Sequence, residues 1–127
     1  MTDAADAVWN RAAMHAGGLD ARAGDQTVAA MLRFHGRAMS SGVVDALMEL
    51  DPIELDDAID GYRYIGLDGA ADVTFSLRQE VDLRAHEDGF EGEADSRYAS
   101  VVPDDATLAA AFEQLFRDRP GDFAPIG

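Results

Sequence analysis

Apolar residues recur every three or four positions along most of the chain, and glycine, proline, serine or aspartate separates the runs. That period is typical of amphipathic helices, because each turn then presents the same side to the core. The best strand candidate, residues 62–65, is better explained as the end of a helix. The pattern therefore predicts an all-α fold, a compact bundle of about six short helices in one domain over residues 1–127.

Two helices are predicted near the N-terminus. The first is capped by Thr2 or Asp3 and runs to about His15, where Gly17 and Gly18 end it. An Asp25 cap starts the second, so residues 1–27 are expected to form a helix and a linker. Ser40-Ser41-Gly42 interrupts it, and a short helix follows with the apolar positions Val43, Val44, Leu47, Met48 and Leu50.

The clearest helix start is Asp51-Pro52-Ile53-Glu54. Aspartate stands at the cap, proline at the first helical position and glutamate three residues after the cap, which closely matches a capping box. The buried stripe expected after it is Leu55, Ala58, Ile59, Tyr62 and Ile65, and the opposite face carries Asp56, Asp57, Asp60 and Tyr64.

Three features define the C-terminal half. An Asp68 cap predicts a helix to about Arg84, with an apolar face made of Ala71, Val73, Phe75, Leu77 and Val81. Residues 86–95 are acidic and contain two glycines, which predicts a mobile connection into a short helix near Tyr98. Pro103-Asp104-Asp105 opens the last helix and Pro120 stops it, after which Phe123 and Ile126 are expected to dock on the core.

Charge changes the functional picture more than any motif. The chain has 25 acidic residues and 10 arginines, with no lysine, for a net charge of −15. Residues 40–107 hold 18 of the acids and four of the arginines. Such a segment repels nucleic acid and anionic membranes and attracts basic proteins in a salt-dependent way. The alternative interpretation is that the acidity serves only solubility.

Patterns for catalysis, metals and cofactors do not appear. The chain has no cysteine, and without lysine it cannot form a P-loop. A calcium loop aligned on Asp56 fails at Ala58 and Leu67, and no histidine forms a helical zinc pair. We therefore predict no catalytic, metal-binding or cofactor-binding residue, and interpret His15 and His35 as core or half-buried. An enzyme would need a deep pocket with His35 or His86 beside a buried carboxylate.

No run of about 18 apolar residues is present, and the first residues are acidic and not basic. These features predict a cytoplasmic protein.

Three stretches and a C-terminal pattern carry a family resemblance. Residues 32–44, LRFHGRAMSSGVV, are followed by ELDDA at 54–58 and GYRYIGLD at 61–68. With Tyr98, Phe112, Phe116 and PGDF at 120–123, they resemble a family of small bacterial proteins similar to the acidic DNA mimics, over residues 28–126. The chain departs from the pattern at Ser40-Ser41-Gly42, where Asn-Gly-Gly is expected. The resemblance implies an all-α, often dimeric protein whose carboxylates imitate DNA phosphates, and it carries over no catalytic or ligand residue.

The combined prediction is an acidic module that binds a basic protein partner. In the specific form of this prediction, the module imitates DNA and occupies a basic DNA-binding protein. Direct binding to nucleic acid or to a membrane is not expected. The carboxylates expected to share one surface are Glu49, Asp56, Asp57, Asp60, Asp72 and Glu80. The alternative is a self-associating structural protein, a homodimer formed through an exposed patch of Met39, Val43, Val44 and Leu47. An enzyme with an unrecognised site ranks third.

Overall fold

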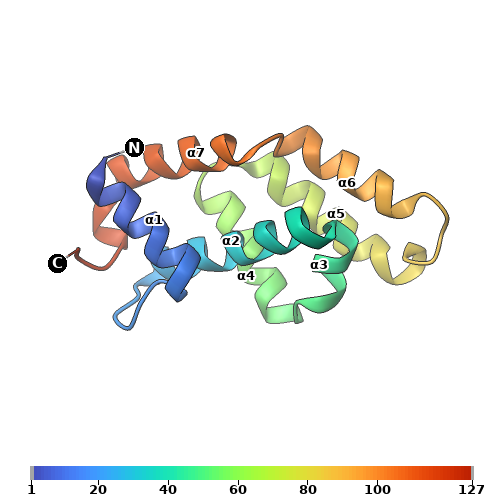
Figure 1. The fold of residues 1–127 in the computed structure, drawn as a ribbon, viewed down its shortest axis with the longest axis horizontal. Coiled ribbons are helices and arrows are strands. Elements are labelled where there is room, and N and C mark those ends of the chain that lie inside the picture. Colours follow the sequence, from blue (N-terminus) through green and yellow to red (C-terminus); the bar gives the residue numbers. More distant parts are fainter. Residues whose placement is uncertain (1, 127) are drawn as a thin grey trace.

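The computed structural model describes residues 2–126 (Figure 1). Within this range the chain forms helices and turns and no strand, so the all-α prediction is confirmed, with seven α-helices where about six were expected. A single 3₁₀ turn, η1, covers Pro120–Asp122. The helices are α1 Asp3–His15, α2 Ala23–Ser41, α3 Val43–Glu49, α4 Pro52–Tyr64, α5 Asp68–Arg84, α6 Phe90–Val101 and α7 Asp105–Asp118.

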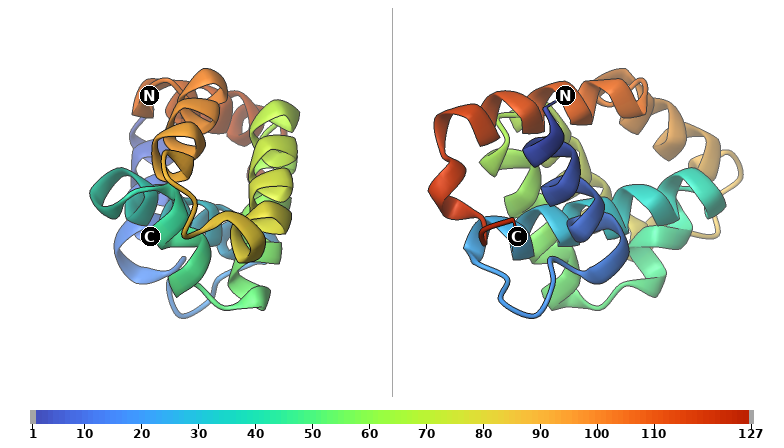
Figure 2. Two further views of the ribbon diagram at one scale, coloured as in Figure 1. Left: turned by 90° about the vertical axis from the view of Figure 1, so that its right-hand side faces the viewer. Right: turned by 60° about the vertical axis from the view of Figure 1, so that its left-hand side comes forward.

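Helix α2 lies at the centre of the arrangement. It packs against α1, α3 and α4, and the chain then continues through α5 and α6, each packed against the helix before it. Figures 1 and 2 show α6 and α7 following one another along one edge, with α1 and the C-terminal segment at the α7 end. This order encloses one core between segments far apart in the sequence.

The crossing of α2 and α4 is close because Gly61 has no side chain. A Cβ at this position would lie 2.7 Å from the Thr27 carbonyl oxygen and 2.8 Å from the Met31 Cβ. Real Cβ atoms do not approach other atoms so closely, so the two backbones can meet only at glycine. The predicted α4 stripe, from Leu55 to Ile65, is buried against this crossing as expected.

Aromatic side chains join the remaining helices to the centre. Phe34, Tyr62 and Tyr98, from α2, α4 and α6, contact one another edge to face with ring centroids 5.9–6.4 Å apart. Trp9 of α1 contacts Phe112 of α7 at 5.1 Å. Edge-to-face pairs add to the free energy gained from area burial alone. Aromatic rings therefore fill much of the core, and the Trp9–Phe112 contact joins α7 to α1.

A buried ion pair fastens the two ends of the chain. Arg11 donates to the Asp25 carboxylate at 2.8 Å and to the Ala124 carbonyl at 2.9 Å. The second oxygen of Asp25 accepts from the backbone N–H of Arg22 at 2.9 Å and of Ala124 at 2.7 Å. Asp25 is fully buried, so these donors replace the water that the carboxylate loses.

Asp25 also corrects the predicted start of the second helix. Helix α2 begins at Ala23, three residues before the start that an Asp25 cap implies, and the Asp25 carboxylate accepts from the Arg22 N–H. The expected linker is therefore shorter than residues 16–27. By contrast, Asp51 caps α4 as predicted, and Thr2, one of the two candidates, caps α1. The predicted opening Pro103-Asp104-Asp105 does begin α7, and Asp104 is its cap.

The predicted mobile connection over residues 86–95 is wrong. Helix α6 begins at Phe90, because Phe90, Ala94 and Tyr98 are buried at a spacing of four residues and anchor a full helix. Helix α5 starts with Asp68 inside it and not as its cap. Smaller errors concern burial: Phe75 and Ile126 are about half exposed, at 47% and 48%, and Tyr64 is half-buried.

None of the helices within residues 2–126 is both long enough and apolar enough to cross a membrane.

Candidate functional site

The six predicted partner-binding carboxylates lie on three consecutive helices. Glu49 is the last residue of α3, Asp56, Asp57 and Asp60 lie on α4, and Asp72 and Glu80 lie on α5. Five are exposed and Glu80 is intermediate. Helices α4 and α5 pack side by side, and Asp56 and Asp72 are each paired with an arginine of the other helix.

Arginines on the neighbouring helix hold two of these acids at the α4–α5 seam. Arg78 of α5 donates to Asp56, and Arg63 of α4 donates to Asp72 at 2.8 Å. The crossed pairing shows that the two helices run antiparallel. Both carboxylates remain about two-thirds exposed, at 65% and 68%, so water and salt screen these pairs.

Glu80 faces the opposite side of α5, toward α6. It pairs with Arg84 at 2.7 Å and Arg97 at 2.9 Å, and both arginines also bind Glu93. Hydrogen bonds from Arg97 and then Arg84 lower the pKa of Glu80 below its usual 4.5. Glu80 is therefore engaged in joining α5 to α6 and is not a free contact for a partner.

The other three acids of the six, Glu49, Asp57 and Asp60, have no ion-pair or hydrogen-bond partner in the part of the chain that the structure describes. Asp57 and Asp60 are three residues apart on the outward face of α4. Glu49 lines a shallow depression together with Arg37, which is itself paired with Asp45 at 2.5 Å. Asp57 and Asp60 are thus the predicted residues best placed to meet a partner.

Every arginine within residues 40–107 is held by carboxylates of the same segment. Arg63 and Arg78 bridge α4 and α5, and Arg84 and Arg97 bridge α5 and α6. Eighteen acids stand against these four cations, so many carboxylates remain uncompensated. The arginines hold helices together, and the surplus negative charge faces outward.

A network of hydrogen bonds among four polar side chains was not expected from the sequence. His35 Nδ1 lies 2.7 Å from the Tyr98 hydroxyl, and His35 Nε2 lies 2.7 Å from Asp105 Oδ1. The Tyr98 hydroxyl in turn contacts the hydroxyl of Tyr62. These four residues come from α2, α6, α7 and α4, and their largest sequence separation, 70 residues, left no local signal.

One assignment of the protons gives every donor in this network an acceptor. With its proton on Nε2, His35 donates to the Asp105 carboxylate and accepts at Nδ1 from the Tyr98 hydroxyl, which in turn accepts from the Tyr62 hydroxyl. Burial, followed by the effects of neighbouring Tyr98, raises the pKa of Tyr62 well above its usual value, and burial raises the pKa of Tyr98. Both phenols are therefore held in the neutral, hydrogen-donating form.

This geometry decides what His35 can do chemically. Both ring nitrogens are engaged, so neither is open to a substrate proton or a metal ion. His35 is buried as expected, whereas His15 is exposed and does not belong to the core. Within residues 2–126 no group of three or more histidine or acidic side chains is arranged to hold a metal ion. The chain of hydrogen bonds ties four helices together.

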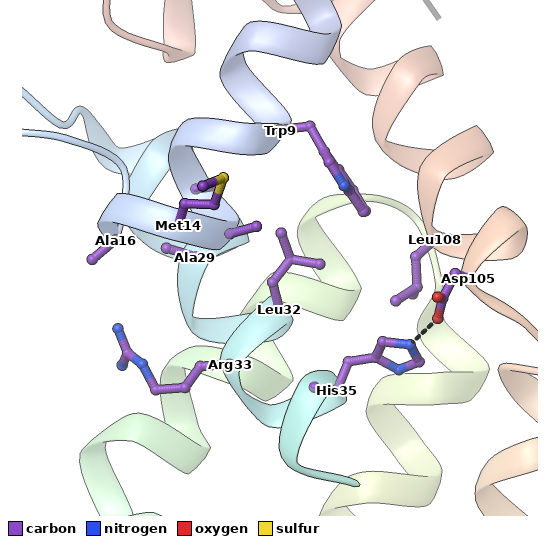
Figure 3. A pocket seen from close by; sticks show the side chains of 12 residues that line it. Trp9, Met14, Ala16, Ala29, Leu32, Arg33, His35, Asp105 and Leu108 are labelled. Atoms are coloured by element: carbon purple, nitrogen blue, oxygen red, sulfur yellow. Dashed lines mark hydrogen bonds and ion pairs between the residues drawn. The ribbon is translucent and has the colours of Figure 1, made fainter. Parts of the chain in front are cut away.

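A cavity of about 570 Å³ lies beside this chain, between α1, α2 and α7 (Figure 3). Trp9, Leu32 and Leu108 project toward it, and His35 and Asp105 form its polar end. The cavity is open, and the Asp105 side chain at its mouth is 86% exposed. The carboxylate beside His35 is thus not the buried one that the enzyme alternative requires. The other lining residues are Ala12, Ala13, Met14, Ala16, Ala29, Arg33 and Gly36.

The four residues predicted to form an apolar patch for self-association do not form an exposed patch. Val43, Val44 and Leu47 are at most 5% exposed and belong to the core, and only Met39 of the four is exposed. These three residues are buried because α3 packs against α2, α5 and α6. Self-association itself stays a prediction.

Comparisons of the chain with models of protein families, with curated proteins and with solved structures find no match. The resemblance to the acidic DNA mimics therefore stays a prediction.

Proposed function

We propose that this protein acts in the cytoplasm as an acidic binding module for a basic protein partner, with Asp57 and Asp60 of α4 at the centre of the contact. The observation that carries the proposal is the internal use of the arginines. Because the four cations of residues 40–107 are engaged in bridging helices, Asp57 and Asp60 are left without an ion-pair partner in the part of the chain that the structure describes.

The ion pairs also give the surface its rigidity. Arg78 and Arg63 join α4 to α5 at both ends of the seam, and Arg84 and Arg97 join α5 to α6. Each exposed pair contributes little to stability by itself. Together they fix the relative positions of the three helices, so a partner would meet carboxylates already held in place, at a small cost in entropy.

DNA mimicry is the specific form of this proposal. Duplex DNA presents one negative charge per ~1.7 Å of its axis, and a mimic must offer comparable density along one side. Asp57 and Asp60 on α4, with Asp56 and Asp72 at the seam, are the carboxylates available for this purpose. The partner would then be a DNA-binding protein, and duplex DNA would compete for it.

The test begins with capture of native-cell proteins on the immobilised protein at low salt and their release at high salt. A released basic protein is purified, and its affinity is measured for the wild type and for the double variant D57N/D60N. We expect at least a tenfold loss of affinity, because two uncompensated charges are removed from the contact. Duplex DNA should displace the partner if mimicry holds.

A matched double variant, D20N/D118N, removes two charges from outside residues 40–107. Both changes lie on exposed positions, so the fold should persist, which far-ultraviolet circular dichroism checks. Equal loss of affinity in both double variants would show general charge attraction and would overturn a contact centred on α4. Failure of any basic protein to bind in a salt-dependent way would overturn the function itself.

A further inference from the structure

The cavity between α1, α2 and α7 has the dimensions of a small-molecule site. Its volume of about 570 Å³ falls in the range of pockets that enclose small ligands. Its walls are mostly apolar, with the Leu32 and Leu108 side chains and the Trp9 indole ring turned toward the same space (Figure 3). An apolar body of the size of one aromatic ring would be removed from water there.

The charge at the cavity is negative and comes from one residue. Asp105 Oδ1 accepts from His35, while Oδ2 makes no hydrogen bond in the described part of the chain. The hydrogen bond from His35 orients the carboxylate at the mouth. Arg33, the other charged lining residue, points away from the space and pairs with Glu54 at 3.1 Å. The free carboxylate oxygen is therefore not paired with an arginine within residues 2–126.

Trp9 supplies an aromatic wall for the apolar body of a ligand. The ring is half-buried and packs on Phe112. Contact with a second aromatic ring adds to the free energy gained from area burial alone. The surrounding protein, with a net charge of −15, raises the local concentration of cations further.

We infer that this cavity binds a small primary amine with an apolar body, the arylalkylamine class, with its ring between Trp9, Leu32 and Leu108 and its ammonium group at Asp105. The site shares no residue with the acidic face of α4 and α5. A test of ligand binding and a test of the proposed protein contact therefore have independent outcomes.

The test uses phenethylamine as the probe and Trp9 as the reporter, because Trp9 is the only tryptophan of the chain. Titration of the amine should change the indole fluorescence in a saturable way. An acid with the same ring and two-carbon linker, 3-phenylpropionate, should give no saturable change, and 2-phenylethanol should bind more weakly than the amine. Calorimetric titration provides a readout independent of the indole.

Two variants locate the bound molecule. Asp105→Asn keeps an oxygen to accept from His35 and removes the charge, so the Kd of the amine should rise about fivefold while that of the alcohol is unchanged. Asp118→Asn, the same change elsewhere on α7, should have no effect. Ala13→Phe fills the cavity from an exposed lining position and should abolish binding of both.

Equal binding of the amine and the acid, or no saturable signal with the amine in either readout, would overturn the inference. So would an amine affinity that Asp105→Asn leaves unchanged.

Discussion

At the scale of single residues, the side chains that matter most are polar groups placed inside the protein. Asp25 and His35 are both buried, and each is surrounded by partners from distant parts of the chain. A buried polar group stabilises a fold only when all of its hydrogen-bonding capacity is met, because removal of one partner leaves the others desolvated. Two predictions follow from this asymmetry.

Replacement of Asp25 by alanine should destabilise the protein by about 3 kcal/mol or more. The change leaves Arg11 without its counter-ion and the Arg22 and Ala124 N–H groups without an acceptor. Urea unfolding measures the loss. Asp20→Ala, at an exposed position, should change stability by less than about 0.5 kcal/mol. Similar values for the two variants would contradict the role of the buried carboxylate.

The order of the buried hydrogen bonds makes two similar substitutions unequal. Tyr98→Phe leaves His35 Nδ1 without a donor and the Tyr62 hydroxyl without an acceptor, and should cost about 2–3 kcal/mol. Tyr62→Phe removes only the terminal donor and should cost about 1 kcal/mol. The same unfolding measurement compares them, and a reversed order would show that the chain runs in the other direction.

At the scale of elements, helix contacts depend on small residues and on caps supplied from elsewhere. Gly61 permits the crossing of α2 and α4, as its missing Cβ shows. Helix α3 has no cap of its own, since Gly42 precedes it, and Asp95 of α6 accepts from the Val43 N–H at 2.9 Å. A helix of seven residues is not stable alone, so α3 exists because its neighbours hold it.

Gly61→Ala should destabilise the protein by about 2 kcal/mol although alanine favours helices. The added methyl group would meet the Thr27 carbonyl and Met31 Cβ, neither of which can move without shifting α2. The control is Gly36→Ala, within α2, where a Cβ would meet nothing within 4 Å. That variant should gain up to about 1 kcal/mol from helix propensity. Thermal unfolding distinguishes the opposite signs.

At the scale of the whole molecule, the fold keeps most charged side chains at the surface and encloses neutral polar ones. Residues 40–107 carry 18 carboxylates, while Tyr62 and Tyr98 are buried, Tyr64 is half-buried, and all three phenols are hydrogen-bonded. Burial raises the pKa of Tyr62, Tyr64 and Tyr98 alike, with the hydrogen bond to Asp122 adding to the effect at Tyr64. The neutral phenols are thus a property of the folded state as a unit.

Alkaline titration should therefore report global unfolding. The phenol pKa values are raised in the folded state, so the stability they contribute is complete below pH 10, the usual tyrosine value, and declines as the pH rises through the folded values. Tyrosinate absorbance should appear together with the loss of helical circular dichroism. In urea, all three tyrosines should titrate near pH 10. Tyrosinate formation in a protein that keeps its helices would contradict the burial.

Local sequence specifies the helical class, the Asp51 cap, the opening of α7 at residues 103–105 and the buried face of α4, because each depends on neighbours within a few residues. It missed the start of α6 at Phe90, where acidic residues and glycines concealed the buried positions.

The hydrogen-bond and ion-pair partners of the buried polar groups depend on how the helices pack. Asp25 meets Ala124 across 99 residues and His35 meets Asp105 across 70, and no local pattern encodes such contacts. The same holds for Glu80, which the helical period places on a surface but which α6 turns into a bridge. Periodicity specifies which side of a helix faces inward, whereas the packing of other helices specifies what that side and its edges touch.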